Sequence, residues 1–194
     1  MSISLKEQET FENLDIKDSD FYLYDFAGCK FFNCTFTNCR FNSCSFSTCE
    51  FNNCKIINPK FNNSRAKFLS FNESTLFGIN WTMLTTNVGY RNPLNSIHKC
   101  VLKYNYFTQM NLIKFSFDES TIINTEFDHC ELSSASFKYC DLTASTFTNS
   151  SLTRANFKNA RGYMIDVRTC SVAKATFSYP DVTNLLVSLD ISIE

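Results

Sequence analysis

Large apolar side chains recur at every fifth position along most of this chain. Two runs show the period most plainly: Phe21, Phe26, Phe31, Phe36, Phe41, Phe46 and Phe51, and Cys29, Cys34, Cys39, Cys44, Cys49 and Cys54. An amphipathic α-helix would repeat at 3.6 residues and a half-buried strand at 2. The pattern therefore predicts a repeat architecture, in which short units stack because none can bury its apolar side chain alone.

The period of five runs through two arrays that differ in phase by one residue. The first extends from Ile16, with Phe11 as an earlier member, to Trp81; the second extends from Leu102 to Phe157, and Phe177 keeps its phase. Ten of the 21 phenylalanines lie on the first array and seven on the second, whereas chance would place about a fifth of them there. The other aromatic core positions that we predict are Phe61, Phe71, Phe107, Phe117, Phe127, Phe137 and Phe147.

Each unit consists of a small residue, a polar residue, a central Phe or Leu and two more polar residues, as in Cys-Thr-Phe-Thr-Asn and Cys-Asp-Leu-Thr-Ala. In this respect residues 16–177 resemble the pentapeptide-repeat family. The resemblance implies an all-β fold, a right-handed quadrilateral parallel β-helix in which four units make one square coil. Phe21, Phe41, Phe61 and Trp81 would then share one interior column. Roughly 26 units predict about 6 to 7 coils and, at ~4.8 Å per coil, a rod about 30 to 35 Å long.

We expect one domain with five parts. Residues 1–15 form a lead-in or cap, 16–81 the first array, 82–101 an interrupting segment with a loop, 102–177 the second array, and 178–194 a C-terminal helix and strand. In a square coil the central side chain and the small residue two positions before it point inward, and the other three face water. The four glycines suggest corners built with negative φ, which do not require glycine.

All ten cysteines, including Cys100, Cys130, Cys140 and Cys170, occupy the small inward position. Burial as a small apolar side chain accounts for them. The Cys-x4-Cys spacing differs from the closer cysteine pairs of zinc sites, so we expect neither metal nor cofactor. With no secretory signal before Leu5 and no apolar run long enough to span a membrane, reduced thiols and a cytoplasmic location are the expectation.

The first break in the repeat is the segment Thr82 to Lys99. Trp81 and Leu102 are 21 residues apart, which corresponds to one coil plus one residue. One interpretation is an irregular coil with a bulge and a protruding turn. The other is a loop that binds a partner through Gly89, Tyr90, Arg91, Asn92 and Pro93, because Tyr and Arg are favoured at interface hot spots.

The second break is the C-terminus. Val182, Leu185, Leu186 and Leu189 are spaced i, i+3, i+4 and i+7, which predicts one amphipathic helix. Ser178 would be its cap, and Pro180 and Asp181 would lie in its first turn. Ile191 and Ile193 follow as the last apolar residues of this tail. The tail resembles that of the Qnr quinolone-resistance branch, which implies a cap that also makes a homodimer, and all six apolar residues are candidates for the cap or dimer interface. Capping alone also explains a helix here, since an open end would expose unpaired backbone.

Catalysis has little support in the sequence. His98 and His129 lie in different phases, and a solvent-facing His98 next to a buried Cys100 would make a poor nucleophile. Acidic pairs such as Asp118 with Glu119 and Glu126 with Asp128 occupy outward positions on a convex rod. No phosphate-binding glycine-rich loop, His-Glu-x-x-His or dinucleotide fingerprint is present, and we expect no enzyme and no small-molecule substrate.

Two functions remain. The resemblance to Qnr-like proteins implies binding to a type II topoisomerase (DNA gyrase or topoisomerase IV), with protection from inhibitors in an antibiotic-resistance role in bacteria. The alternative is a scaffold that binds a different protein through rows of Asn, Thr and Ser. We expect no direct nucleic-acid binding, since there is no basic stripe interleaved with aromatics, and no membrane binding.

Charge argues against imitation of DNA along the whole rod. Duplex DNA carries one charge per ~1.7 Å, so a rod of this length would replace on the order of 20 phosphates, whereas the formal net charge is −1. Between Asp118 and Asp141 six acids accompany one Lys, and between Arg154 and Lys174 five cations accompany Asp166. We therefore expect acidic and basic bands around the rod rather than an acidic stripe along it.

Overall fold

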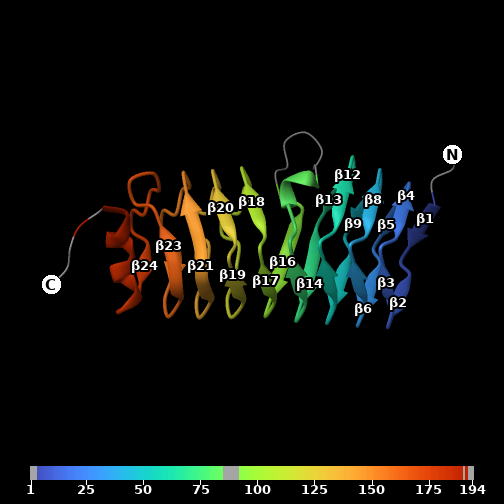
Figure 1. Ribbon diagram of the computed structural model, residues 1–194, viewed down its shortest axis with the longest axis horizontal. Coiled ribbons are helices and arrows are strands. Elements are labelled where there is room, and N and C mark those ends of the chain that lie inside the picture. Colours follow the sequence, from blue (N-terminus) through green and yellow to red (C-terminus); the bar gives the residue numbers. More distant parts are fainter. Residues whose placement is uncertain (1–3, 85–91, 190, 192–194) are drawn as a thin grey trace.

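The computed structural model describes residues 4–84, 92–189 and 191. These residues form a parallel β-solenoid whose short strands stack along one axis, with the N-terminus at one end of the rod and the C-terminal helix at the other (Figure 1). Strands stack with residues twenty apart as partners, and they form four faces, which we call A to D. The predicted parallel β-helix is confirmed.

Faces A and B carry the first and second strand of each coil. Face A contains β1 (Ser4–Glu7), β5 (Tyr24–Ala27), β9 (Ser45–Ser47) and β13 (Arg65–Lys67). Face B contains β2 (Thr10–Glu12), β6 (Lys30–Phe32), β10 (Glu50–Asn52), β14 (Leu69–Asn72), β16 (Leu94–His98), β22 (Asn156–Phe157) and β24 (Thr176–Phe177). In the second half of the rod isolated bridges continue both faces, for example Asn111 with Glu131 and Ser116 with Ser136.

Faces C and D carry the third and fourth strands. Face C contains β3 (Asp15–Lys17), β7 (Thr35–Thr37), β11 (Lys55–Ile57), β15 (Thr75–Phe77), β17 (Val101–Lys103) and β19 (Thr121–Ile123). Face D contains β4 (Asp20–Tyr22), β8 (Arg40–Asn42), β12 (Lys60–Asn62), the 3₁₀-helix η1 (Trp81–Met83), β18 (Tyr106–Thr108) and β20 (Glu126–Asp128). Both faces end on β21 (Asp141–Thr148) and β23 (Arg161–Ile165), and η2 (Asp181–Leu189) follows as the C-terminal helix.

The core consists of columns of stacked rings. Phe21 and Phe41 stack with centroids 4.9 Å apart, and Phe41 and Phe61 stack at 5.5 Å, which confirms that part of the predicted column. The face B column has nine levels, at Phe11, Phe31, Phe51, Phe71, Ile97, Phe117, Phe137, Phe157 and Phe177. Eight steps of ~4.8 Å make a rod about 38 Å long, so the estimate of 6 to 7 coils was too low.

The repeat begins earlier than residue 16. Strand β1 pairs with β5 and strand β2 with β6 in the same register as later coils, and Phe11 stacks on Phe31 at 4.9 Å. Residues 4–15 are thus part of the first coil rather than a separate lead-in.

The interruption between the arrays is six residues long. Leu76 pairs with Leu102, 26 positions later, and Trp81 stacks on Phe107 with centroids 5.8 Å apart. The interpretation of one coil plus one residue, which would place Trp81 over Leu102, was wrong. Spacings of 21 and 26 shift the phase of a five-residue repeat equally, so the pattern alone could not separate them.

The corners use positive φ, contrary to our expectation. In nearly every described unit the second residue after the central one is left-handed, with φ between 49° and 61° at 27 non-glycine positions and between 64° and 72° at three glycines. Asparagine fits this region because its short side chain tolerates it. In the second half many corners are type II turns: the amide of Phe115 donates to the carbonyl of Leu112 at 3.1 Å, and Lys114 has φ 59°. A type II turn requires positive φ at that position.

The inward small positions form a second ladder. All ten cysteines are free thiols and buried, and Sγ of Cys49 donates to the carbonyl of Phe26 in the preceding coil at 3.4 Å. Serine uses the same position: the amide of Cys54 donates to Oγ of Ser74 at 3.0 Å. Burial raises the pKa of the thiols of Cys49 and Cys140 to about 12, so they are weakly nucleophilic.

The C-terminal helix is wound more tightly than the α-helical spacing predicted, with about 3.0 residues per turn instead of 3.6. Asp181–Leu189 is a 3₁₀-helix, in which every third residue shares a face. Leu185 packs against the core, whereas Leu189, on the same predicted apolar stripe, is 44% exposed. No helix within the described ranges is long and apolar enough to cross a membrane.

Candidate interaction surfaces

The candidate catalytic groups lie apart on the outer surface. His98 is exposed on face B, next to a buried Cys100 whose thiol pKa is raised by burial. Nδ1 of His129 lies 2.7 Å from Oδ2 of Asp128, and the same carboxylate accepts from the Thr148 hydroxyl at 2.8 Å. These bonds, the one with His129 foremost, lower the pKa of Asp128. Within the described part of the chain no three His, Cys, Asp or Glu side chains gather as metal ligands.

The acidic pairs named above are tied to neighbouring coils rather than to one another. Asp118 accepts a hydrogen bond from the amide of Lys138 at 2.8 Å and pairs with its Nζ at 3.1 Å. Glu119 pairs with Nζ of Lys99 at 3.7 Å. These carboxylates do not converge on a common point where a substrate proton could be held.

Pairing between coils neutralises part of the surface charge. Five ion pairs join residues twenty apart: Asp20 with Arg40, Lys30 with Glu50, Lys99 with Glu119, Asp118 with Lys138, and Asp141 with Arg161. Exposed pairs of this kind contribute only about 0 to 1 kcal/mol each to stability. Because each of these acids has a cation one coil away, and the formal net charge is −1, the charge of duplex DNA is not reproduced along the rod.

The predicted partner loop is described only at its end. Gly89, Tyr90 and Arg91 lie outside the described residues. Asn92 accepts a hydrogen bond from the amide of Leu94 at 2.9 Å through its side chain, and Pro93 is buried, with its carbonyl accepting from Leu69 at 2.9 Å. These last two residues therefore belong to the coil; Pro93 is buried, and Asn92 stays partly exposed.

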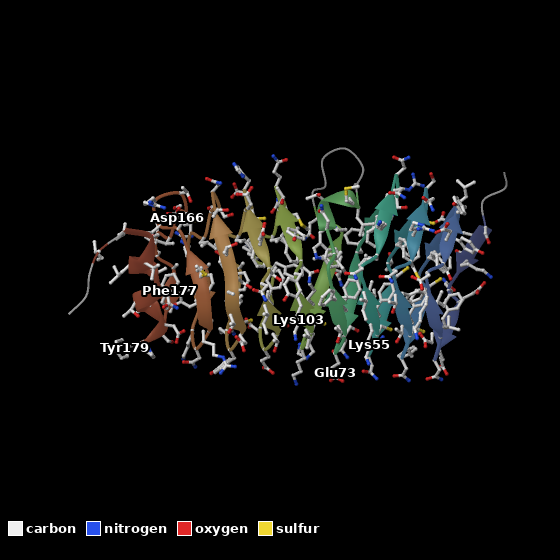
Figure 2. The ribbon with its side chains drawn as sticks, viewed as in Figure 1. Lys55, Glu73, Lys103, Asp166, Phe177 and Tyr179 are labelled. Carbon is white, nitrogen blue, oxygen red and sulfur yellow. The ribbon has the colours of Figure 1, made fainter. Side chains whose placement is uncertain are left out.

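The C-terminal helix covers the end of the solenoid. Oδ1 of Asp181 accepts from the amide of Gly162 at 2.9 Å, and Oγ of Ser188 accepts from the amide of Val167 at 3.2 Å. Both bonds satisfy amides of the final coil, as a cap should. Figure 2 shows this end of the molecule, where Phe177 lies at the last level of the face B column.

The predicted dimer residues divide between cap and surface. Val182, Leu185 and Leu186 are partly buried, while Leu189 and Ile191 are exposed and Ile193 lies outside the described residues. Val187, which the helical spacing did not single out, is 71% exposed. A hollow of about 350 Å³ lies beside this helix, between β21, β23 and η2.

An outward apolar row on face C escaped the sequence analysis, because all outward positions were treated as polar. Ile57 pairs with Phe77, Phe77 with Lys103, and Lys103 with Ile123, all at the position just after the central residue. The rings of Phe77 and Tyr104 lie 5.2 Å apart. Comparing outward positions at the correct spacing of 20 and 26 residues would have shown this row.

The fold and the repeats define the class. The family model of pentapeptide repeats matches residues 130–161 in eight copies. That segment is pentapeptide-repeat sequence, and the described chain has the pentapeptide-repeat solenoid fold.

Particular solved structures are similar to this chain. HetL, a pentapeptide-repeat protein involved in heterocyst differentiation regulation from the cyanobacterium Nostoc sp. strain PCC 7120, is 11% identical, with 89% of this chain and 86% of HetL covered and a TM-score of 0.50. Full-length QnrB1, a plasmid-mediated fluoroquinolone-resistance protein, is 17% identical, with 97% and 100% covered and a TM-score of 0.35. At these identities HetL supports the fold alone. The comparison with curated proteins yields no match.

Proposed function

We propose that the chain is a non-enzymatic binding protein that acts through protein–protein contact. The observation that carries this proposal is the outer surface of the rod: it presents an apolar row on face C, and five ion pairs join charges of successive coils. Paired charges and exposed apolar side chains are features of a contact surface rather than of a site that polarises a substrate.

The partner that we propose is a type II topoisomerase, DNA gyrase or topoisomerase IV, with protection from inhibitors as the outcome. Support comes from the resemblance of the repeats and C-terminal tail to the Qnr branch. The mode of contact would differ from imitation of DNA, since five coil-to-coil ion pairs cancel acidic charge. Binding would rest on apolar and hydrogen-bonding contacts.

A supercoiling assay with purified gyrase and a fluoroquinolone tests this partner. The protein is titrated from below to well above the enzyme concentration. Restored supercoiling supports the proposal, and its loss on Tyr90→Ala combined with Arg91→Ala, which leaves the coil residues Asn92 and Pro93 in place, would assign the contact to that segment. If the protein neither restores nor inhibits supercoiling anywhere in this range, a topoisomerase is not its partner.

The second candidate function is a scaffold for a different protein. Ladders of asparagine favour it, because they make regular hydrogen-bonding rows: Nδ2 of Asn53 donates to Asn33 at 2.8 Å, and Nδ2 of Asn62 donates to Asn42 at 2.9 Å. A chain without effect on gyrase that still binds the acidic peptide described below would favour the scaffold.

Homodimerisation through the C-terminal end is part of the proposal. The exposed apolar side chains of this end are Val187, Leu189 and Ile191. Substitution of Val187 and Leu189 by Asp should halve the sedimentation mass and leave the fold intact, since neither side chain is buried. Leu185→Asp is a poorer test because Leu185 packs on the core. A wild-type monomer would overturn this part.

A further inference from the structure

An apolar patch lies in the middle of face C and extends across its corner onto face D. Strand pairing aligns Ile57, Phe77, Lys103 and Ile123 in four successive coils. Val101 precedes Lys103 on the same side of β17, and Tyr104 and Tyr106 follow around the corner. We call Ile57, Phe77, Val101, Tyr104, Tyr106 and Ile123 the central patch.

The central patch is accessible and local. Tyr104 is 47% exposed and Tyr106 43%, and the other four residues are partly exposed. In the coils on either side, the position of Ile57 and Ile123 is taken by Thr37 and Thr143. The core does not explain the apolar residues, because the inward positions of these strands are already filled by Ile56, Leu76, Leu102 and Ile122.

Two unpaired lysines accompany the patch. No carboxylate among the described residues forms an ion pair with Lys55 or Lys103, whereas Lys30, Lys99 and Lys138 all pair with an acid one coil away. Figure 2 shows Lys55 and Lys103 on the same side of the rod as Glu73. Glu73 is the sole acid in the sequence between Lys55 and Lys114, so the middle of the rod is a basic belt.

The spacing of the coils fits a helix laid along the rod. Stacked rings on adjacent levels are 4.7 to 5.8 Å apart, so the row from Ile57 to Ile123 spans three steps, about 14 to 17 Å. Three helical turns advance ~16 Å, whereas three alternate-residue steps of an extended strand advance ~20 Å. An apolar stripe on a helix therefore matches the row to within about 2 Å, and a strand does not.

We propose that the central patch binds an acidic amphipathic helix of a partner protein. The apolar stripe of the helix packs on Ile57, Phe77 and Ile123 and on the aliphatic stem of Lys103, and flanking carboxylates pair with Lys55 and Lys103. This inference rests on the proposed function of protein contact and adds to it a surface and a partner chemistry.

Nucleic acid fits the patch less well. Phe77, Tyr104 and Tyr106 offer rings on which a base could stack, but Ile57, Val101 and Ile123, which make up half of the patch, do not. Acidic bands flank the basic belt on both sides, with seven acids and two lysines in residues 4–27 and six acids and one lysine in residues 118–141. A continuous phosphate backbone would meet repulsion on leaving the belt in either direction.

Fluorescence anisotropy with a designed probe tests the proposal. The probe is a labelled, end-blocked peptide of about 18 residues, with Leu at i, i+3, i+4 and i+7 positions and Glu on the flanking positions. We expect saturable binding to the full chain, about tenfold weakening for Phe77→Ser, and at least tenfold weakening for Lys55→Glu combined with Lys103→Glu.

Each patch variant has a control variant with the same kind of substitution at a site outside the patch. Ile113 is 48% exposed on face A, so Ile113→Ser removes an apolar side chain that is more exposed than Phe77 and lies outside the patch. Lys67→Glu with Lys114→Glu reverses two lysines of the same belt without touching the patch. Circular dichroism of every variant confirms the fold, and these controls should change the affinity less than twofold.

Three outcomes would overturn the proposal: a peptide with Lys in place of Glu binds as tightly, the control variants lose as much affinity as the patch variants, or a single-stranded oligonucleotide binds more tightly than the acidic peptide. The gyrase assay is independent of these readouts. Rescue of gyrase without peptide binding removes the patch proposal and leaves the proposed function standing. Peptide binding without an effect on gyrase removes the topoisomerase as partner.

Discussion

Removal of one ring from the middle of the core should lower the free energy of unfolding far more than removal of one ring at the end of the rod. Phe127 has no exposed surface. It stacks on Phe107 and Phe147 with centroids 4.8 and 4.7 Å apart, and it meets Phe117 and Phe137 edge-on at 5.7 and 5.8 Å. Phe127→Ala removes all four ring contacts and leaves a void that coils on both sides hold open.

The expected cost follows from that geometry. Truncation of a buried Phe costs about 3 to 5 kcal/mol, and the lost ring pairs, ~0.5 to 1.5 kcal/mol each, place Phe127→Ala at the upper end of that range. Phe11→Ala is the matched control, because Phe11 is only partly buried and stacks on one ring, Phe31. We expect it to cost about 1 to 2 kcal/mol.

Equilibrium unfolding in guanidinium, followed by far-ultraviolet circular dichroism, measures both variants. Repeat proteins can unfold in parts, so native-state hydrogen exchange of the face D strands should accompany the midpoints. Equal midpoints for Phe127→Ala and Phe11→Ala would refute the continuous ring columns as the main source of stability.

Three further predictions concern the corners, the surface and the thiols. Gly162→Ala should lower the melting temperature by several degrees, since φ is +72° and a Cβ would lie 2.8 Å from Cα of Thr143. The control is Ala144→Gly at a corner that is already left-handed, and it should change the melting temperature much less than Gly162→Ala does. Asp128→Asn should lower the melting temperature at pH 7, and the difference from the unsubstituted chain should shrink as the pH falls below the unfolded pKa of ~3.9: the pKa of Asp128 is lowered in the folded state, so its contribution is present above the unfolded pKa and is lost as pH falls through the folded value. A difference that does not shrink on acidification would contradict this assignment. The ten cysteines should react slowly with a thiol reagent at pH 8 in the native state and rapidly in denaturant, since burial raises the pKa of Cys49 and Cys140 to about 12; several fast native thiols would show that the small positions do not face inward.

The sequence was sufficient for the parts of the structure that depend on periodicity. The five-residue period predicted the inward columns, and Phe21, Phe41 and Phe61 stack as expected. It also placed every cysteine in the interior. These features follow from burial alone, because the buried positions recur every five residues along the sequence.

The features that were missed depend on long-range register or on backbone conformation. The six-residue interruption between Leu76 and Leu102 has the same phase as a one-residue slip. Nine of the 27 described non-glycine left-handed residues are asparagine, a signal that the sequence analysis did not use, and the others are as different as Leu23, Tyr104 and Arg154. The central patch on face C becomes visible only when outward residues are aligned with the register of the folded coils.

The central claim is that this rod binds a protein partner by local contact rather than by the charge of DNA. Biolayer interferometry of the chain on immobilised gyrase at 50 and 200 mM salt tests it most directly. Contacts through a few lysines and apolar side chains predict a loss of affinity of about tenfold or less between the two salt concentrations. DNA-like binding that replaces about 6 to 10 phosphate contacts would lose ~10³ to 10⁵. A loss in that range would contradict the mode of contact, and the absence of binding at both salt concentrations would contradict gyrase as the partner.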